Sequence, residues 1–264
     1  MPKQSSLIRL EGKMDGISFY KRKGSFYAKR ATGPSKERIL TDPKFKRTRE
    51  NLTEFQALGQ ASRVFKRALR PVSNFTDGDM RNRMMKVFRR INKLSEGPRG
   101  QRPVHFSQNR NVLKGLQLHP TNVFEDVCEA RITVTHKADR TGCTVTIPSL
   151  QTGEMIKAPV NATHFRIAQL ITAIPDIVYD TTSDKYKPSD VFFENLSEIK
   201  FSEYFTVSTT EPVTITLETL FVNVPPLPEH VSVLQGVGII FYELVGDIQY
   251  PLNDGLAMSI ADVF

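Results

Sequence analysis

The hydrophobic pattern of this chain changes its period near residue 104. In the two stretches before that point, residues 52–69 and 80–94, apolar residues recur every three or four positions, which is typical of amphipathic helices. After it, apolar and polar residues alternate in short runs rich in β-branched residues, which is typical of half-buried strands. At 264 residues the chain is long enough to bury a real core. The pattern predicts an α+β fold with a C-terminal antiparallel β-sandwich or jelly-roll-like domain.

Residues 1–41 predict a basic β-hairpin arm with a linker. Residues 7–30 contain short strands separated by the turn dipeptides Asp15-Gly16 and Lys23-Gly24, which indicates a small β-meander. A sheet of this size needs a partner surface to be stable. Residues 31–41 are expected to form an extended linker.

Aromatic and basic residues are interleaved in this arm. The preferred interpretation is that the rings pack the meander onto a neighbour while the lysines are solvated. The alternative is that the rings stack nucleobases, as in platforms for single-stranded nucleic acid. The candidate residues of this assembly arm are Phe19, Tyr20, Phe26, Tyr27, Lys29 and Arg30.

Residues 42–103 predict a basic helical hairpin. Asp42 as N-cap and Pro43 as the first helical residue start a helix that is expected to end near residue 70. A second helix is expected over residues 77–94. Both apolar stripes are too hydrophobic to face water, so they are expected to be buried between the two helices or under a neighbour. The candidate packing residues are Phe55, Phe65, Met84, Phe88 and Ile91.

The opposite face of the second helix is strongly basic. Such a face suits nucleic-acid phosphates or an acidic protein surface, although a solvated charged face is the simplest interpretation. The residues of this basic face are Arg81, Arg83, Lys86, Arg89, Arg90 and Lys93.

Glycines and prolines at residues 97–103 mark the expected boundary of an acidic β domain over residues 104–264. Its clearest feature is a hairpin of residues 131–136 and 143–147 across a turn at 139–142. Further strands are expected at residues 163–172, 177–180, 204–208, 213–222, 237–244, 248–252 and 256–263.

The charge of the chain is divided between its two ends. Residues 1–120 hold 28 Lys and Arg against 9 Asp and Glu, a net +19, whereas residues 121–264 carry a net −11. The basic end of one copy is therefore attracted to the acidic end of another, or folds back on its own. A protein that only binds nucleic acid gains little from the acidic half.

Motifs for catalysis are absent from the sequence. The five histidines lack metal-ligand spacing, and no Walker loop, dinucleotide-binding motif or nucleophile elbow occurs. We therefore expect no enzyme, no metal and no cofactor. The start lacks a signal peptide and no apolar run is long enough to span a membrane, so cytoplasmic residence without a membrane partner is expected. Cys128 and Cys143 are then expected to remain thiols.

Three stretches are distinctive, namely residues 12–20, residues 33–39 with 42–51, and residues 238–243 with 249–252. Together they resemble an uncharacterised family found in Bacteroidota genomes. The resemblance implies a basic N-terminal arm followed by a β domain. It assigns no activity and no catalytic residues.

These features favour a structural subunit that assembles with itself into a filament, tube or other particle. In this hypothesis the basic arm docks head-to-tail on the acidic β domain of the next copy. The alternative is a nucleic-acid-binding protein that uses the basic helix and the aromatic residues of the arm.

Overall fold

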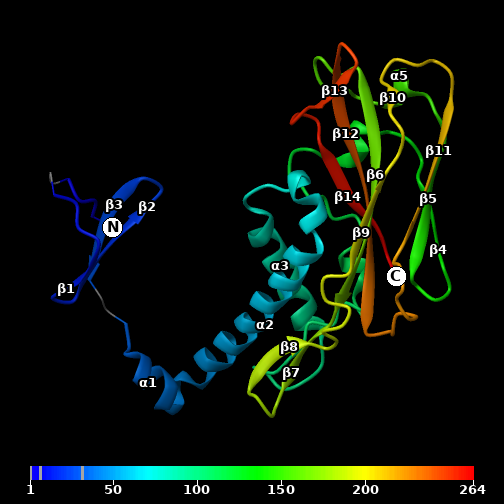
Figure 1. The fold of residues 1–264 in the computed structure, drawn as a ribbon. Coiled ribbons are helices and arrows are strands. Elements are labelled where there is room, and N and C mark those ends of the chain that lie inside the picture. Colours follow the sequence, from blue (N-terminus) through cyan, green and yellow to red (C-terminus); the bar gives the residue numbers. More distant parts are fainter. Residues whose placement is uncertain (1, 6–7, 31–32) are drawn as a thin grey trace. The chain divides into compact units, whose positions relative to one another are not determined.

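The chain forms two compact units. The computed structural model describes residues 2–5, 8–30 and 33–264. Unit 1 is Met1–Glu50 and unit 2 is Asn51–Phe264. Both helices and antiparallel sheets are present, as an α+β fold requires (Figure 1). The expected boundary at residues 97–103 does not separate the compact units, because the helical residues after 50 share unit 2 with the sheets.

The described strands of unit 1 form the expected antiparallel meander. They are β1 (Gly12–Met14), β2 (Ile17–Arg22) and β3 (Ser25–Arg30). The first turn has φ angles of 45° and 74°, and the second has 48° and 77°. Two successive left-handed residues define a type I′ turn, whose twist matches that of the flanking strands.

The segment expected to be an extended linker contains a helix instead. Helix α1 (Lys36–Thr41) begins after Ser35, whose side chain accepts a hydrogen bond from the backbone N–H of Arg38. The expectation is therefore wrong over residues 36–41, because a serine N-cap starts a helix there. Residues 31–32 of that linker lie outside the described residues. Asp42 then caps the 3-10 helix η1 (Pro43–Phe45).

Both longer helices expected from the sequence are present. They are α2 (Lys46–Ala68) and α3 (Met80–Leu94), and the 3-10 helix η2 (Arg70–Phe75) connects them. Four expected packing residues are buried, namely Phe65, Met84, Phe88 and Ile91. The expectation that Phe55 is buried between the helices is wrong, since it is 62% exposed.

A large antiparallel sheet forms the centre of unit 2. Its strands are β6 (His164–Pro175), β9 (Ser197–Phe201), β10 (Phe205–Thr206), β12 (Val231–Val245), β13 (Ile248–Pro251) and β14 (Ala257–Val263). A second sheet contains β4 (Thr133–His136), β5 (Gly142–Leu150) and β11 (Val213–Leu220). A third contains β7 (Ile177–Asp180) and β8 (Lys185–Pro188). Short helices are η3 (Arg110–Val112), α4 (Phe124–Val127) and α5 (Thr152–Met155).

The large sheet buries both of its faces. Along β6, Ala168, Leu170 and Ile174 belong to a core that includes α2, α3 and η2. The alternate residues Phe165 and Ile167 belong to a second core with side chains of β5 and β11. Figure 1 shows the helices on one side of β6 and β12 and the smaller sheet on the other. The helices therefore belong to the same unit as the sheets because they cover one face of β6.

The expected strands of the β domain are confirmed, with boundaries shifted by a few residues. The predicted hairpin is β4–β5, whose turn contains Arg140 at a φ of 62°. The sequence pattern missed β8 and β9, which are short and rich in charged residues. Within the described part of the chain, no helix is both long and apolar enough to cross a membrane.

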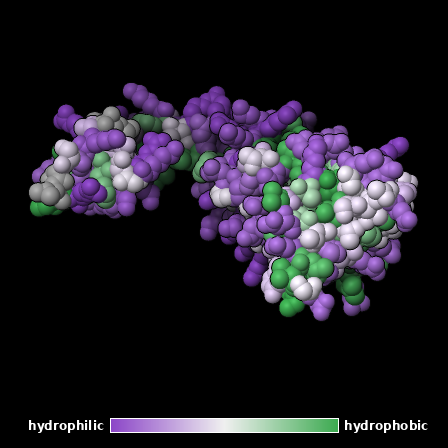
Figure 2. Space-filling view, turned by 90° about the horizontal axis from the view of Figure 1, so that it is seen from above, coloured by the Kyte–Doolittle hydropathy of each residue, from purple (hydrophilic) through white to green (hydrophobic). Residues whose placement is uncertain are grey.

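The β12–β13 hairpin exposes apolar side chains at its end. Leu244, Val245, Ile248 and Tyr250 are each at least 40% exposed. Figure 2 views the molecule from above, toward the end of unit 2 where this hairpin lies in Figure 1, and shows hydrophobic patches among hydrophilic atoms there. Residues 231–264 contain no lysine or arginine, so every charge close to this hairpin in sequence is acidic.

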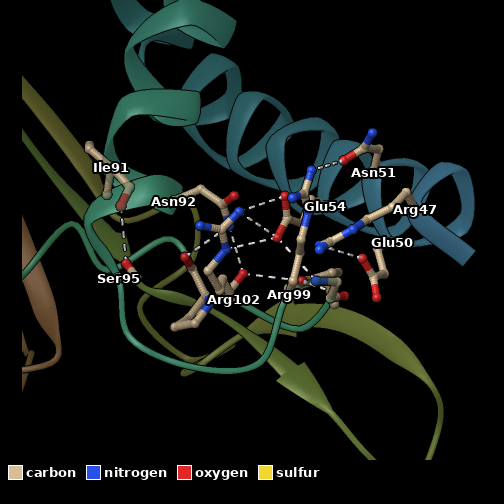
Figure 3. A network of polar contacts seen from close by, with 12 residues as sticks. Arg47, Glu50, Asn51, Glu54, Ile91, Asn92, Ser95, Arg99 and Arg102 are labelled. Atoms are coloured by element: carbon tan, nitrogen blue, oxygen red, sulfur yellow. Dashed lines mark hydrogen bonds and ion pairs between the residues drawn. The ribbon is translucent and has the colours of Figure 1, made fainter.

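Residues 97–103 are held in place by polar contacts rather than acting as a free linker (Figure 3). Arg102 donates to both carboxylate oxygens of Glu54 in α2, at 2.8 and 2.9 Å. The backbone N–H of Gly100 also donates to Glu54, at 3.0 Å. Asn92 and Tyr186 donate to carbonyl oxygens of the same segment. These contacts of Glu54, Asn92 and Tyr186 with residues 97–103 explain why the expected domain boundary lies inside unit 2.

Candidate functional site

The meander of unit 1 presents two chemically different faces. Neighbouring residues of a strand point to opposite faces, and directly paired residues share a face. Pairing of Phe19 with Ala28 and of Ile17 with Met14 therefore defines an apolar face. The apolar face contains Met14, Ile17, Phe19, Phe26 and Ala28. The tyrosine face contains Lys13, Ser18, Tyr20, Arg22, Tyr27 and Lys29.

The four arm aromatics expected to act together are thus divided between the two faces. On the tyrosine face, the rings of Tyr20 and Tyr27 stack with centroids 5.8 Å apart and an interplanar angle of 24°. The Lys29 ammonium lies 5.7 Å from the Tyr20 ring centroid. On the other face, the Arg9 guanidinium and the Lys21 ammonium lie 5.1 and 5.4 Å from the Phe26 ring centroid. Arg30 pairs with Ile17, so its side chain lies on the apolar face as well.

The apolar face is poorly covered. None of the residues of unit 1 whose burial the structure describes is fully buried. Met14 is 58% exposed and Ile17 is 39% exposed. A three-stranded sheet of this size needs a hydrophobic face packed on another surface for independent stability. The arrangement therefore suits a docking element rather than an autonomous domain.

Five of the six basic-face residues of α3 are exposed, namely Arg81, Lys86, Arg89, Arg90 and Lys93. Arg83 is the exception and does not belong to the exposed face. Its guanidinium donates to Asp77 at 2.5 Å and to the carbonyl oxygen of Leu118 at 2.7 Å. Arg83 therefore connects the first turn of α3 to the segment that contains Leu118.

Both cysteines are free thiols, as the sequence predicted for Cys128 and Cys143, and both are buried. Burial raises the pKa of the Cys143 thiol to about 12, and it also raises the pKa of Cys128. Gln169 donates to the Cys143 sulfur at 3.0 Å. A thiol that stays protonated is a poor nucleophile, so neither side chain is prepared for covalent chemistry.

A cluster around Asp176 was not found from the sequence. Its buried carboxylate accepts hydrogen bonds from the Ser107 hydroxyl at 2.5 Å and the Ser107 backbone N–H at 2.9 Å. It also lies 3.0 Å from Nδ1 of His105. The Ser107 hydroxyl donates its hydrogen bond to the carboxylate rather than to the imidazole, which differs from the arrangement that activates a serine nucleophile. The cluster is best explained as an anchor for residues 105–107.

Within the described residues, no group of three or more His, Cys, Asp or Glu side chains is arranged to hold a metal ion. The strongest functional feature is therefore the two-faced meander with its basic surroundings. No family model, curated protein or solved structure compared with the chain gives a significant match.

Proposed function

We propose that this protein is a structural subunit that assembles head-to-tail with copies of itself through the apolar face of the meander. The observation that supports this most directly is the exposed apolar face of a unit without a fully buried described residue. Unit 1 contains 14 Lys and Arg against 5 Asp and Glu, so the docking partner should be acidic. The charge of residues 121–264 fits that requirement.

The end of the β12–β13 hairpin is the proposed acceptor. It combines exposed Leu244, Val245 and Ile248 with the acidic Glu243 and Asp247. The meander offers the complementary combination of apolar residues and cations. Strand β13 also pairs only with β12 among the described strands, so its outer edge is open to an added strand.

The proposal includes two further expectations, one on the arrangement of the sheets and one on the cellular location. We propose that the large sheet and the β4–β5–β11 sheet form an antiparallel sandwich, a view supported by the core that side chains of both sheets share. We also propose cytoplasmic residence, with the free thiols of Cys128 and Cys143 as support.

Ile17→Asp is expected to abolish assembly, because it places a carboxylate on the apolar face next to Met14. Light scattering and sedimentation should show a single chain, whereas the wild type should form larger species. Ser18→Asp introduces the same charge one residue away on the opposite face, and it should still assemble.

Ile248→Asp tests the acceptor in the same way. Each of the two variants keeps one intact surface, so a mixture of Ile17→Asp and Ile248→Asp should form a one-to-one complex and nothing larger. A wild-type protein that stays monomeric at high concentration would contradict the proposal. Normal assembly of Ile17→Asp would contradict it as well.

Binding of single-stranded nucleic acid is the second candidate function, and the Tyr20–Tyr27 stack supports it. These rings lie among Lys13, Arg22 and Lys29 on one face, the combination that stacks bases and follows a phosphate backbone. Tyr27→Ala should then weaken binding of a fluorescent oligonucleotide by about 1–3 kcal/mol. Met14→Ser, on the opposite face, should leave the affinity unchanged. Equal affinities of wild type and Tyr27→Ala would reject this function.

A further inference from the structure

A cavity of about 740 Å³ lies in unit 2 where α2 ends and α3 begins. Its volume falls within the range of about 300–1,000 Å³ that is usual for small-molecule sites. Its walls come from the last turns of α2, from η2 and from the first turn of α3. All of the lining residues, from Gly59 to Met84, belong to unit 2, so their arrangement is defined by its fold.

Cationic side chains dominate the polar part of this wall. They are Arg63, Lys66, Arg67, Arg70 and Arg81. Arg67 forms an ion pair with Glu194 at 2.6 Å. The side chain of Arg63 contacts Gln60, which is neutral. Among the described residues, Lys66, Arg70 and Arg81 form no salt bridge, so several positive charges at the cavity remain uncompensated.

Asp77 is the acidic residue of the lining, and it is already paired. Burial would raise the pKa of Asp77, but the hydrogen bond and the positive charge of Arg83 hold this pKa below its usual value. The carboxylate therefore stays ionised and its charge is matched by Arg83 rather than by the other arginines. It does not neutralise the cavity.

The rest of the wall combines hydroxyl groups with an apolar floor. Ser62, Ser73 and Thr76 supply the hydroxyls. The floor is formed by the buried side chains of Phe65, Leu69, Met80 and Met84. Methionine side chains adapt to ligands of different shape. The cavity thus offers a surface for a flat apolar group beside a cluster of cations.

We propose that this cavity binds a small phosphorylated compound of nucleotide size, with its phosphates on the cations and its apolar ring on the apolar wall. Phosphate groups suit the site better than a single carboxylate does. Each guanidinium can donate two hydrogen bonds to the oxygens of one phosphate, and a polyanion is needed to balance the charge of several cations. The start of α3 at Gly78 and Met80 adds a positive helix end to the same wall. This proposal does not depend on assembly through the meander.

Isothermal titration calorimetry of the wild-type chain tests the proposal, and a repeat on the Ile17→Asp background shows whether the affinity is independent of assembly. ATP should bind, inorganic pyrophosphate should bind more weakly, and adenosine should bind weakest. Arg70→Ala and Arg81→Ala should each weaken ATP binding about tenfold or more, as expected for the loss of a charge-assisted hydrogen bond.

Arg90→Ala and Lys93→Ala are the matched controls, because they remove the same charge from α3 outside the cavity. Their ATP affinity should change less than about twofold by this reasoning, since distant exposed charges are screened. Met80→Ala should weaken ATP binding without changing pyrophosphate binding.

Three results would overturn the proposal. The first is no ATP binding at millimolar concentration. The second is equal weakening by the cavity variants and the controls. The third is an oligonucleotide that binds more tightly than ATP and depends on the same Arg70 and Arg81, which would assign the cations to a nucleic-acid strand.

Discussion

Phe88→Asp is expected to leave unit 2 unfolded at room temperature. The Phe88 side chain is completely buried, and its ring makes edge contacts with Phe65 and Phe106, each with centroids 5.4 Å apart. Loss of a buried phenylalanine costs about 3–5 kcal/mol. Burial of an unpaired carboxylate adds several kcal/mol. The sum is comparable to the entire stability of a domain, about 5–15 kcal/mol.

The measurement is urea denaturation followed by circular dichroism. The wild type should show a cooperative transition, and Phe88→Asp should lack a folded baseline. Phe55→Asp is the matched control, because Phe55 lies on α2 but is 62% exposed. A Phe88→Asp protein with a wild-type midpoint would show that Phe88 is not buried between α2 and α3.

The different fates of Phe55 and Phe65 show what the helical pattern can and cannot predict. The spacing of apolar residues identified α2 and its stripe, because it depends only on the period of the helix. The buried residues of α2 begin at Ala57, however, and its first turns contain none. How much of α2 is buried depends on where the large sheet lies against it. The sequence of the helix alone does not contain this information.

Local sequence signals predicted the turns and the longer strands well. Asp15-Gly16 and Lys23-Gly24 adopt the left-handed conformations of the turn, which Asp and Gly favour and which Lys23 also takes up. Strand β9 was missed although Ser197–Phe201 alternates in burial, because its five residues include two that are charged. Helix α1 was missed although Ser35 is a good N-cap, because Gly33 and Pro34 suggested an extended segment.

The candidate sites depended more strongly on tertiary structure. Alternation along β2 was sufficient to separate Phe19 from Tyr20, so the two faces of the meander were predictable in principle. The cavity was not, because it joins residues of α2 with the start of α3 across a connection whose path the sequence does not fix. The position of Arg83 also depends on tertiary structure. Its partners, Asp77 and the carbonyl of Leu118, lie outside α3, so its absence from the exposed basic face could not be predicted from the helix alone.

Glu54→Ala is expected to destabilise unit 2 by about 2–4 kcal/mol, the range for a partly buried charged group left without its partner. Glu54 accepts three hydrogen bonds from Arg102 and Gly100. Its removal leaves the Arg102 guanidinium, whose side chain is 21% exposed, without a carboxylate. The segment that Tyr186 and Asn92 also hold is then free to open. The loss should appear as a lower urea midpoint.

Arg102→Ala and the double variant separate the pair from its surroundings. If the two side chains act mainly on each other, the double variant should lose clearly less stability than the two single variants together, with a coupling of about 0.5–3 kcal/mol. Glu96→Ala removes an exposed carboxylate beyond the end of α3 and should change the midpoint little. Additive losses would show that Glu54 stabilises residues 97–103 through Gly100 alone. An unchanged midpoint for Glu54→Ala would show that the contacts of Glu54 do not help to hold α2, α3 and β8 together.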